Sequence, residues 1–163
     1  MKATIFYTKI LVLFLTLTSL TANAIDKQAF YATFSKGNLQ QINALITNLE
    51  VNSNSSLVKA YIGSLYVKKA DLLSSAKSKL DAFNKGKELL EKEIKNNPNN
   101  VEYRFLRLAI QERAPWIVGY SSNIDEDKEF IIKNFSKLGA YVQKQIIGFS
   151  KTSEVLEYKE LKP

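Results

Sequence analysis

Residues 57–109 constrain the fold most, because they have the pattern of two long helices followed by the start of a third. Helix-forming residues run from 76 to 95, and a polar run at 96–100 that contains a proline ends them. Asn99 is followed three positions later by Glu102, which is the spacing of a capping box at the start of a new helix. The sequence therefore predicts antiparallel helix pairs that stack on one another.

The first 24 residues have the pattern of an export signal. Two lysines precede an apolar stretch at 10–20, and Ala-Asn-Ala at 22–24 is typical of a signal peptidase site. The apolar stretch is shorter than the roughly 20 residues of a membrane-spanning helix. We expect cleavage after Ala24 and export of residues 25–163, to the periplasm in a Gram-negative host and otherwise to the medium. An uncleaved anchor is the alternative, and a lipoprotein is not expected because the chain has no cysteine.

The charge pattern argues against nucleic acid as a partner. The formal net charge is +7, and it falls to +5 without the two lysines of the signal. Basic residues are mixed with acidic ones, as in the segment 85–93, which is typical of solvated helix faces. A nucleic-acid-binding protein would more often gather Lys and Arg on one face. We expect neither nucleic-acid binding nor stable membrane insertion of the exported chain.

The chain has no Cys and no His, which removes several kinds of chemistry. Thiolate nucleophiles, thiolate zinc sites and imidazole bases are excluded. Only three Pro and six Gly argue against a loop-rich or all-β fold. The sequence predicts one all-α domain at 25–163, with no cofactor, no metal and no catalytic activity.

About seven helices and no sheet are expected. The expected helices are 27–35, 38–51, 56–73, 76–96, one from Val101 to near Ala114, one from a capping box at Ser122 and Asp125 to about Phe135, and a last one with Val142, Ile146 and Phe149. The helix 56–73 is apolar nearly all round and should be central. The helix 76–96 should bury Leu80, Phe83, Leu90 and Ile94. The charged tail 152–163 is interpreted as a frayed helix.

Residues 62–66, Ile-Gly-Ser-Leu-Tyr, resemble the L-G-x-x-Y core of the first helix of a tetratricopeptide repeat. Gly86, Leu90 and Pro98 resemble the small residue, the large apolar residue and the terminal proline of its second helix. The pair at 37–38, Gly-Asn, resembles the turn of a preceding degenerate repeat. The chain is similar to small exported bacterial proteins of this repeat class that have no established activity.

Three departures from the repeat are present. The distance from Tyr66 to Gly86 is 11 residues longer than in the repeat, so the first helix or its turn must be extended. Glu93 replaces a small Ala, and the segment 104–111 lacks the aromatic and apolar signature of a following repeat. The resemblance implies a short right-handed superhelix whose first helices line a concave surface.

Three polar residues on one predicted helix are candidates for partner binding. Arg104, Arg107 and Gln111 have i, i+3 and i+7 spacing and share one side of an otherwise apolar helix. If that side faces the concave surface, two guanidinium groups could bind a carboxylate, such as a peptide C-terminus. The alternative is that they pair with carboxylates of the chain itself: Glu88, Glu91 or Glu102.

Aromatic residues supply further candidates. Tyr61, Tyr66 and Lys69 could line the same groove, although tyrosines at these spacings are more often core or rim residues. Trp116 and Tyr120 belong to an apolar loop that could dock a partner through aromatic anchors. The alternative is that this loop folds back and covers one end of the helix stack.

Two other patterns carry little weight. Asn123, Asp125 and Asp127 alternate as in a calcium loop, but Lys128 stands where such a loop needs glycine. The segment 74–77, Ser-Ser-Ala-Lys, matches S-x-x-K of serine acylases, which need a sheet and a much longer chain.

The sequence therefore favours an exported helical-repeat protein that binds or scaffolds a protein or peptide partner through a concave groove. One alternative is an accessory subunit packed against an envelope complex through the loop at Trp116. Another is a binder of small molecules with a pocket between helices. The oligomeric state is left open.

Overall fold

The computed structural model describes residues 25–51 and 55–161. The predicted signal peptide at 1–24, with its cleavage site, lies outside these residues. Every helix described below lies in the part of the chain that we expect to be exported.

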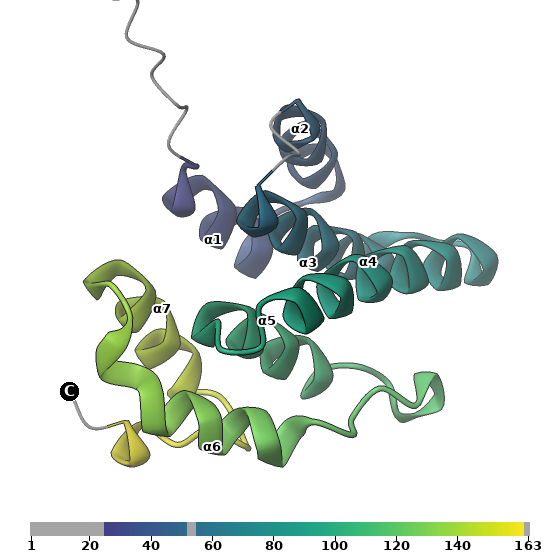
Figure 1. Cartoon of the computed structure of the whole chain (residues 1–163). Helices are drawn as coiled ribbons and strands as arrows, with labels where there is room; N and C mark the ends of the chain where they lie inside the picture. Colours follow the sequence, from purple (N-terminus) through teal and green to yellow (C-terminus); the bar gives the residue numbers. More distant parts are fainter. Residues whose placement is uncertain (1–24, 52–54, 162–163) are drawn as a thin grey trace, which may run out of the picture.

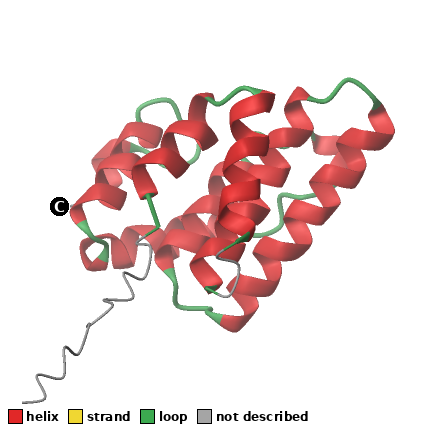
Figure 2. Ribbon diagram, turned by 90° about the horizontal axis from the view of Figure 1, so that it is seen from above, coloured by secondary structure: helices red, strands yellow, loops and turns green. Residues whose placement is uncertain are grey.

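The described residues confirm an all-α fold with seven α-helices and no strand (Figure 2). The α-helices are α1 (Lys27–Lys36), α2 (Leu39–Glu50), α3 (Ser56–Leu72), α4 (Ala76–Asn96), α5 (Val101–Gln111), α6 (Ile124–Asn134) and α7 (Ala140–Ser150). The described residues also form three short 3₁₀ helices: η1 (Trp116–Val118), η2 (Phe135–Lys137) and η3 (Tyr158–Glu160). Within the described ranges, no helix combines the length and the apolar character needed to cross a bilayer.

Consecutive helices pack as neighbours: α1 on α2, α3 on α4, and α5 on α6. The odd-numbered helices also contact one another in the order α1, α3, α5 and α7. In Figure 1, α1 and α2 lie at the top, α3, α4 and α5 below them, α7 to the left of α5, and α6 at the bottom. This order brings the first helices of successive pairs together.

Helix α3 is the central element, as its apolar sequence predicts. It contacts α1, α2, α4 and α5. Tyr61 and Leu65 of α3 are fully buried, and the Tyr61 ring stacks on Phe30 of α1 with the ring centroids 3.6 Å apart. Because α3 has partners on all sides, it has no need of a wide polar face.

Two glycines set the distance between α3 and α4. A Cβ atom added at Gly86 would lie 2.4 Å from the Gly63 carbonyl oxygen and 2.7 Å from the Val67 amide nitrogen. The two backbones therefore touch where each helix lacks a side chain. The 11 extra residues between Tyr66 and Gly86 lengthen the helices, which have 17 and 21 residues, and the link between them stays short.

Both predicted capping boxes after residue 96 are wrong. Helix α5 is capped by Asn100, whose side chain accepts from the Tyr103 amide. The Glu102 side chain has no capping role and accepts hydrogen bonds in the core instead. Helix α6 starts after Asn123, and no side chain caps it. Its first turn carries three acidic residues, which offset the positive end of the helix dipole instead.

Two burial predictions are also corrected. Leu80 of α4 is 53% exposed, and it belongs to an exposed stretch at 74–81 that precedes the buried Ala82 and Phe83. The tail after residue 152 is packed rather than frayed, since Leu156 and Leu161 are buried. The Glu112 carboxylate holds the tail by accepting from the Ser153 hydroxyl at 2.7 Å.

The contact between α3 and α4 gives a test with a matched control. Gly86→Ala forces a methyl group against the backbone of α3, and we expect a loss of about 1–3 kcal/mol in the free energy of unfolding. Gly148→Ala, within α7, meets no atom within 4 Å and should gain roughly 0.5–1 kcal/mol from helix propensity. Urea denaturation followed by circular dichroism measures both. A Gly86→Ala protein as stable as the parent would contradict the close contact.

Candidate binding cavity

A cavity of about 490 Å³ lies between the odd-numbered helices. Its walls come from the C-terminal parts of α1, α3, α5 and α7, with Phe83 of α4 added. The apolar side chains in the walls are Phe34, Val67, Phe83, Phe105, Ala109, Ile110 and Phe149. The surface that the first helices share thus contains a largely apolar hollow.

Helix α5 contributes one whole face to this cavity. Phe105, Ala109 and Arg113 follow one another at intervals of four residues, which places them on one side of the helix and its C-terminal extension. The Phe105 ring packs against Phe149 of α7 at 5.4 Å and against Tyr31 of α1 at 6.5 Å between centroids. Phe105 therefore joins the two opposite walls.

Small residues leave the volume open. Ala109 and Gly148 both line the cavity, the first with a methyl group and the second with no side chain. A Cβ atom at Gly148 would have no atom within 4 Å, and Gly148 itself is exposed. The cavity is thus accessible from solvent along α7.

The polar groups around the cavity are mostly cationic. Lys36, Lys68 and Arg113 line it together with a single carboxylate, Asp71. The Lys68 ammonium nitrogen lies 3.8 Å from a carboxylate oxygen of Asp71. Among the described residues, neither Lys36 nor Arg113 has a carboxylate within ion-pair distance. The rim can therefore attract an anion, while the walls accept apolar groups.

A buried carboxylate holds the α1 wall in place. Glu102 of α5 accepts hydrogen bonds from the hydroxyl of Tyr61 at 2.5 Å and from the hydroxyl of Tyr31 at 3.1 Å. Its other oxygen accepts from Lys27 at 2.5 Å. Burial and the nearby Glu102 charge raise the pKa of both tyrosines far above the usual value. Tyr31, which lines the cavity, is thereby tied to α3 and α5.

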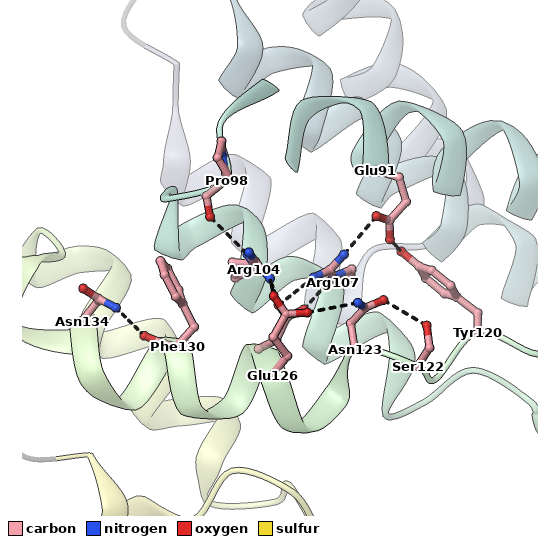
Figure 3. Close-up of polar contacts among 11 residues, drawn as sticks. Glu91, Pro98, Arg104, Arg107, Tyr120, Ser122, Asn123, Glu126, Phe130 and Asn134 are labelled. Atoms are coloured by element: carbon pink, nitrogen blue, oxygen red, sulfur yellow. Dashed lines mark hydrogen bonds and ion pairs between the residues drawn. The ribbon is translucent and has the colours of Figure 1, made fainter. Parts of the chain in front are cut away.

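The predicted arginine pair lies on the opposite side of α5, against α6 (Figure 3). Arg107 binds Asp127 through two hydrogen bonds, at 2.6 and 2.8 Å, and Glu91 of α4 at 3.0 Å. Arg104 contacts Asp127 at 2.9 Å and Glu126 at 2.6 Å. Asp127 is fully buried, so its charge depends on these two guanidinium groups.

The pKa shifts in this cluster follow from its ion pairs. Burial lowers the pKa of Arg107, but hydrogen bonds and charges from Asp127 and Glu91 outweigh burial and raise it overall. The hydrogen bond from Arg104 lowers the pKa of Glu126. Both arginines and Glu126 are therefore ionised at neutral pH. The ion pairs of this cluster join α4, α5 and α6.

The arginines thus pair with carboxylates of the chain itself, which is the alternative to partner binding that the sequence left open. Of the three glutamates expected, only Glu91 is involved, and the other partners lie on α6. Arg107 is only 4% exposed. A partner's carboxylate would have to displace buried ion pairs. Gln111 is also buried, and its side-chain amide has no hydrogen-bond partner in the described part of the chain.

The other predicted site residues lie apart from the cavity. Tyr61 is in the core, and Tyr66 lies on another side of α3, where its hydroxyl accepts from Lys85 at 2.7 Å. Lys69 lies 5.8 Å from the Tyr66 ring centroid. The two candidates from the loop differ in exposure, since Trp116 is 90% exposed and Tyr120 is buried. Trp116 therefore does not cover the end of the stack, and none of the eight predicted residues lines the cavity.

Of the residues that line the cavity, Phe83 is predicted from the sequence to be buried. Phe105 and Ala109 belong to the helix that the sequence analysis describes as otherwise apolar, and apolar residues of this kind are typical of a core. The signal that could have distinguished them is Arg113, which continues their four-residue spacing with a charge. No feature of the sequence indicates that Lys36 and Gly148 line the cavity, because their positions depend on how α1 and α7 pack.

The chemistry of the lining suits binding. The cavity contains apolar side chains, three cations, one carboxylate and the hydroxyls of Ser35 and Thr152. Within the described ranges, no three His, Cys, Asp or Glu side chains gather in a way that could hold a metal ion. Such a lining can hold an apolar group and a nearby negative charge.

Comparison with protein-family models, with curated proteins and with solved structures finds no match. The resemblance to the tetratricopeptide repeat and the right-handed superhelix that it implies stay predictions.

Replacing Asp127 separates a structural role of the arginines from partner binding. Asp127→Asn leaves the buried Arg107 and the half-buried Arg104 without their shared carboxylate, and we expect a loss of about 3–5 kcal/mol in the free energy of unfolding. Asp125→Asn, at an exposed position of the same helical turn, should cost at most about 0.5 kcal/mol. Urea denaturation at pH 7 compares the two. Equal stabilities would favour arginines that are free for a partner.

The buried tyrosines predict a loss of stability at alkaline pH. In the unfolded chain Tyr31 and Tyr61 lose protons near pH 10, whereas in the folded protein their raised pKa values keep them protonated. The contribution of these tyrosines to the free energy of unfolding should therefore be fully present below pH 10. Above pH 10 the free energy of unfolding should fall by up to about 1.4 kcal/mol per pH unit for each tyrosine.

Urea denaturation between pH 8 and pH 11 measures this slope. The double variant Tyr31→Phe, Tyr61→Phe should flatten it, while Tyr158→Phe, at an exposed tyrosine, should not. Identical slopes in both variants would refute the effect of Glu102 and burial.

Proposed function

We propose that this chain is a non-catalytic binding protein that receives an apolar segment of a peptide or protein partner in the cavity between α1, α3, α5 and α7. One observation carries the proposal: a solvent-accessible cavity of about 490 Å³ with mainly apolar walls. Ligand sites of proteins commonly have volumes of about 300–1,000 Å³ and such walls.

The arrangement of the cavity supports binding without chemistry. Its lysines and arginine lie near the rim and its aromatic rings form the walls, so a ligand meets charge first and apolar surface next. The cavity holds no pair of a nucleophile and a base in hydrogen-bond contact among the described residues. Binding energy would come from the burial of apolar area against Phe105 and Phe149.

We place this activity outside the cytoplasm, after removal of residues 1–24, in the periplasm if the host is Gram-negative. The partner's apolar side chains would occupy the cavity, and its backbone would run along the exposed side at Gly148. In this proposal Arg104 and Arg107 act as structural residues, and charge selection falls to Lys36, Lys68 and Arg113.

Filling the cavity tests the proposal. Nile red, a neutral apolar dye, should bind the protein with an increase in fluorescence. Gly148→Leu places a side chain in the open space of α7, and we expect it to weaken dye binding roughly tenfold or more. Lys144→Leu adds the same side chain at an exposed position of α7 that does not line the cavity, and it should leave dye binding unchanged.

Circular dichroism verifies that both variants are folded. Displacement of the dye by a pool of apolar hexapeptides supports a peptide partner, whereas displacement by decanol alone would favour a small molecule. Absence of dye binding, or equal binding by both variants, would refute the proposed function.

A further inference from the structure

The connection between α5 and α6 presents two large apolar side chains to solvent. Trp116 is 90% exposed and Ile117 is 75% exposed. Both belong to η1, a defined turn in which the Gly119 amide donates to the Trp116 carbonyl at 3.0 Å. Gly119 has φ 59°, which favours glycine and closes the turn. Figure 1 shows this connection standing clear of the helices, at the right.

The turn is anchored from behind. Tyr120, directly after it, is buried; its ring packs edge-on against Phe83 at 5.8 Å, and its hydroxyl donates to Glu91 at 2.5 Å. Before the turn, Ala114 and Pro115 line the cavity. The exposure of Trp116 and Ile117 therefore belongs to a fixed structure at the edge of the cavity.

Positive charge surrounds this edge. Arg113 is exposed three residues before Trp116, and the Lys87 ammonium group lies 4.9 Å from the Tyr120 ring centroid. Lys36 and Lys68 add two cations around the cavity. The carboxylates nearby have partners of their own: Asp71 lies by Lys68, Glu91 pairs with Arg107, and Glu112 accepts from Ser153 and from the Glu154 amide. Cations thus exceed free carboxylates on this side of the protein.

We propose that Trp116 and Ile117 insert into the interface of an anionic lipid bilayer and set the mouth of the cavity against the membrane surface. Indole rings favour the boundary between headgroups and acyl chains, and Lys and Arg are attracted to anionic headgroups. This interaction goes beyond the proposed function, because it does not depend on what occupies the cavity. It is a peripheral contact through a loop and requires no membrane-spanning helix.

A bilayer fits this surface better than a protein partner does. A stable protein interface buries about 800 Å² on each side, with several anchoring residues inside a polar rim. Here two neighbouring side chains form a narrow projection with cations behind it. A narrow apolar tip with positive charge behind it matches a fluid apolar layer under negatively charged headgroups.

The chain offers its own reporter, because Trp116 is its only tryptophan. The full chain is expressed in a bacterial host and purified in the form that the host produces. Emission is then recorded with vesicles of phosphatidylcholine and phosphatidylglycerol at a ratio of about 3:1. We expect a shift to shorter wavelength that saturates with lipid, weakens with added salt and is much smaller with phosphatidylcholine alone.

Variants distinguish insertion from other binding. Ile117→Ser should weaken vesicle binding roughly tenfold or more, whereas Val51→Ser, at an exposed apolar residue of another helix end, should not change it. Ile117→Ser should bind Nile red as the parent does, so that the membrane contact and the cavity are tested separately. An unshifted Trp116 emission with anionic vesicles, or equal vesicle binding by the two variants, would refute the membrane contact. A shift caused only by envelope proteins free of lipid would point to a protein partner and also overturn it.

Discussion

Charged side chains of α5 are buried, and the need to neutralise them governs how the other helices are placed around this one. Glu102 accepts from Lys27, Tyr31 and Tyr61, which ties α1 and α3 to one side of α5. Arg107 pairs with carboxylates of α4 and α6 and ties these helices to another side. A buried charge without its partner is strongly destabilising, so these contacts exclude most other arrangements of the same helices.

The cavity is a consequence of this arrangement. With both charged sides of α5 occupied, its remaining face presents Phe105 and Ala109 toward the ends of α1 and α7. The helices α3 and α4 approach as closely as two backbones can, at Gly63 and Gly86. At α7, by contrast, Gly148 faces open space. Glycine thus has opposite effects in the two places. It permits close contact in the core and leaves free volume at the cavity, and the difference lies in what packs against each glycine.

The helices themselves could be predicted because their causes are local. Apolar periodicity and polar breaks placed the expected segments close to α1 through α7. One wrong prediction concerns two adjacent residues that suit the same position equally well. Asn99 and Asn100 are both good caps, and Asn100 is used, which frees Glu102 for the tyrosines. Leu80 fits the apolar face of α4, but the buried part of that face begins only at Ala82. Periodicity states which face is apolar and does not state how far along the helix a neighbour extends.

The sequence by itself determined the all-α class, the helix boundaries within a few residues, the central place of α3 and the absence of thiol and imidazole chemistry. Only the tertiary structure decided what the polar residues of α5 do. The spacing of Arg104 and Arg107 suits an open groove and a buried ion pair equally well, because helical spacing shows which residues share a face and leaves open what that face meets. The deciding partner, Asp127, lies 20 residues further along the chain, on a separate helix. The cavity depends in the same way on five separate helices, so its lining exists only once they have packed together.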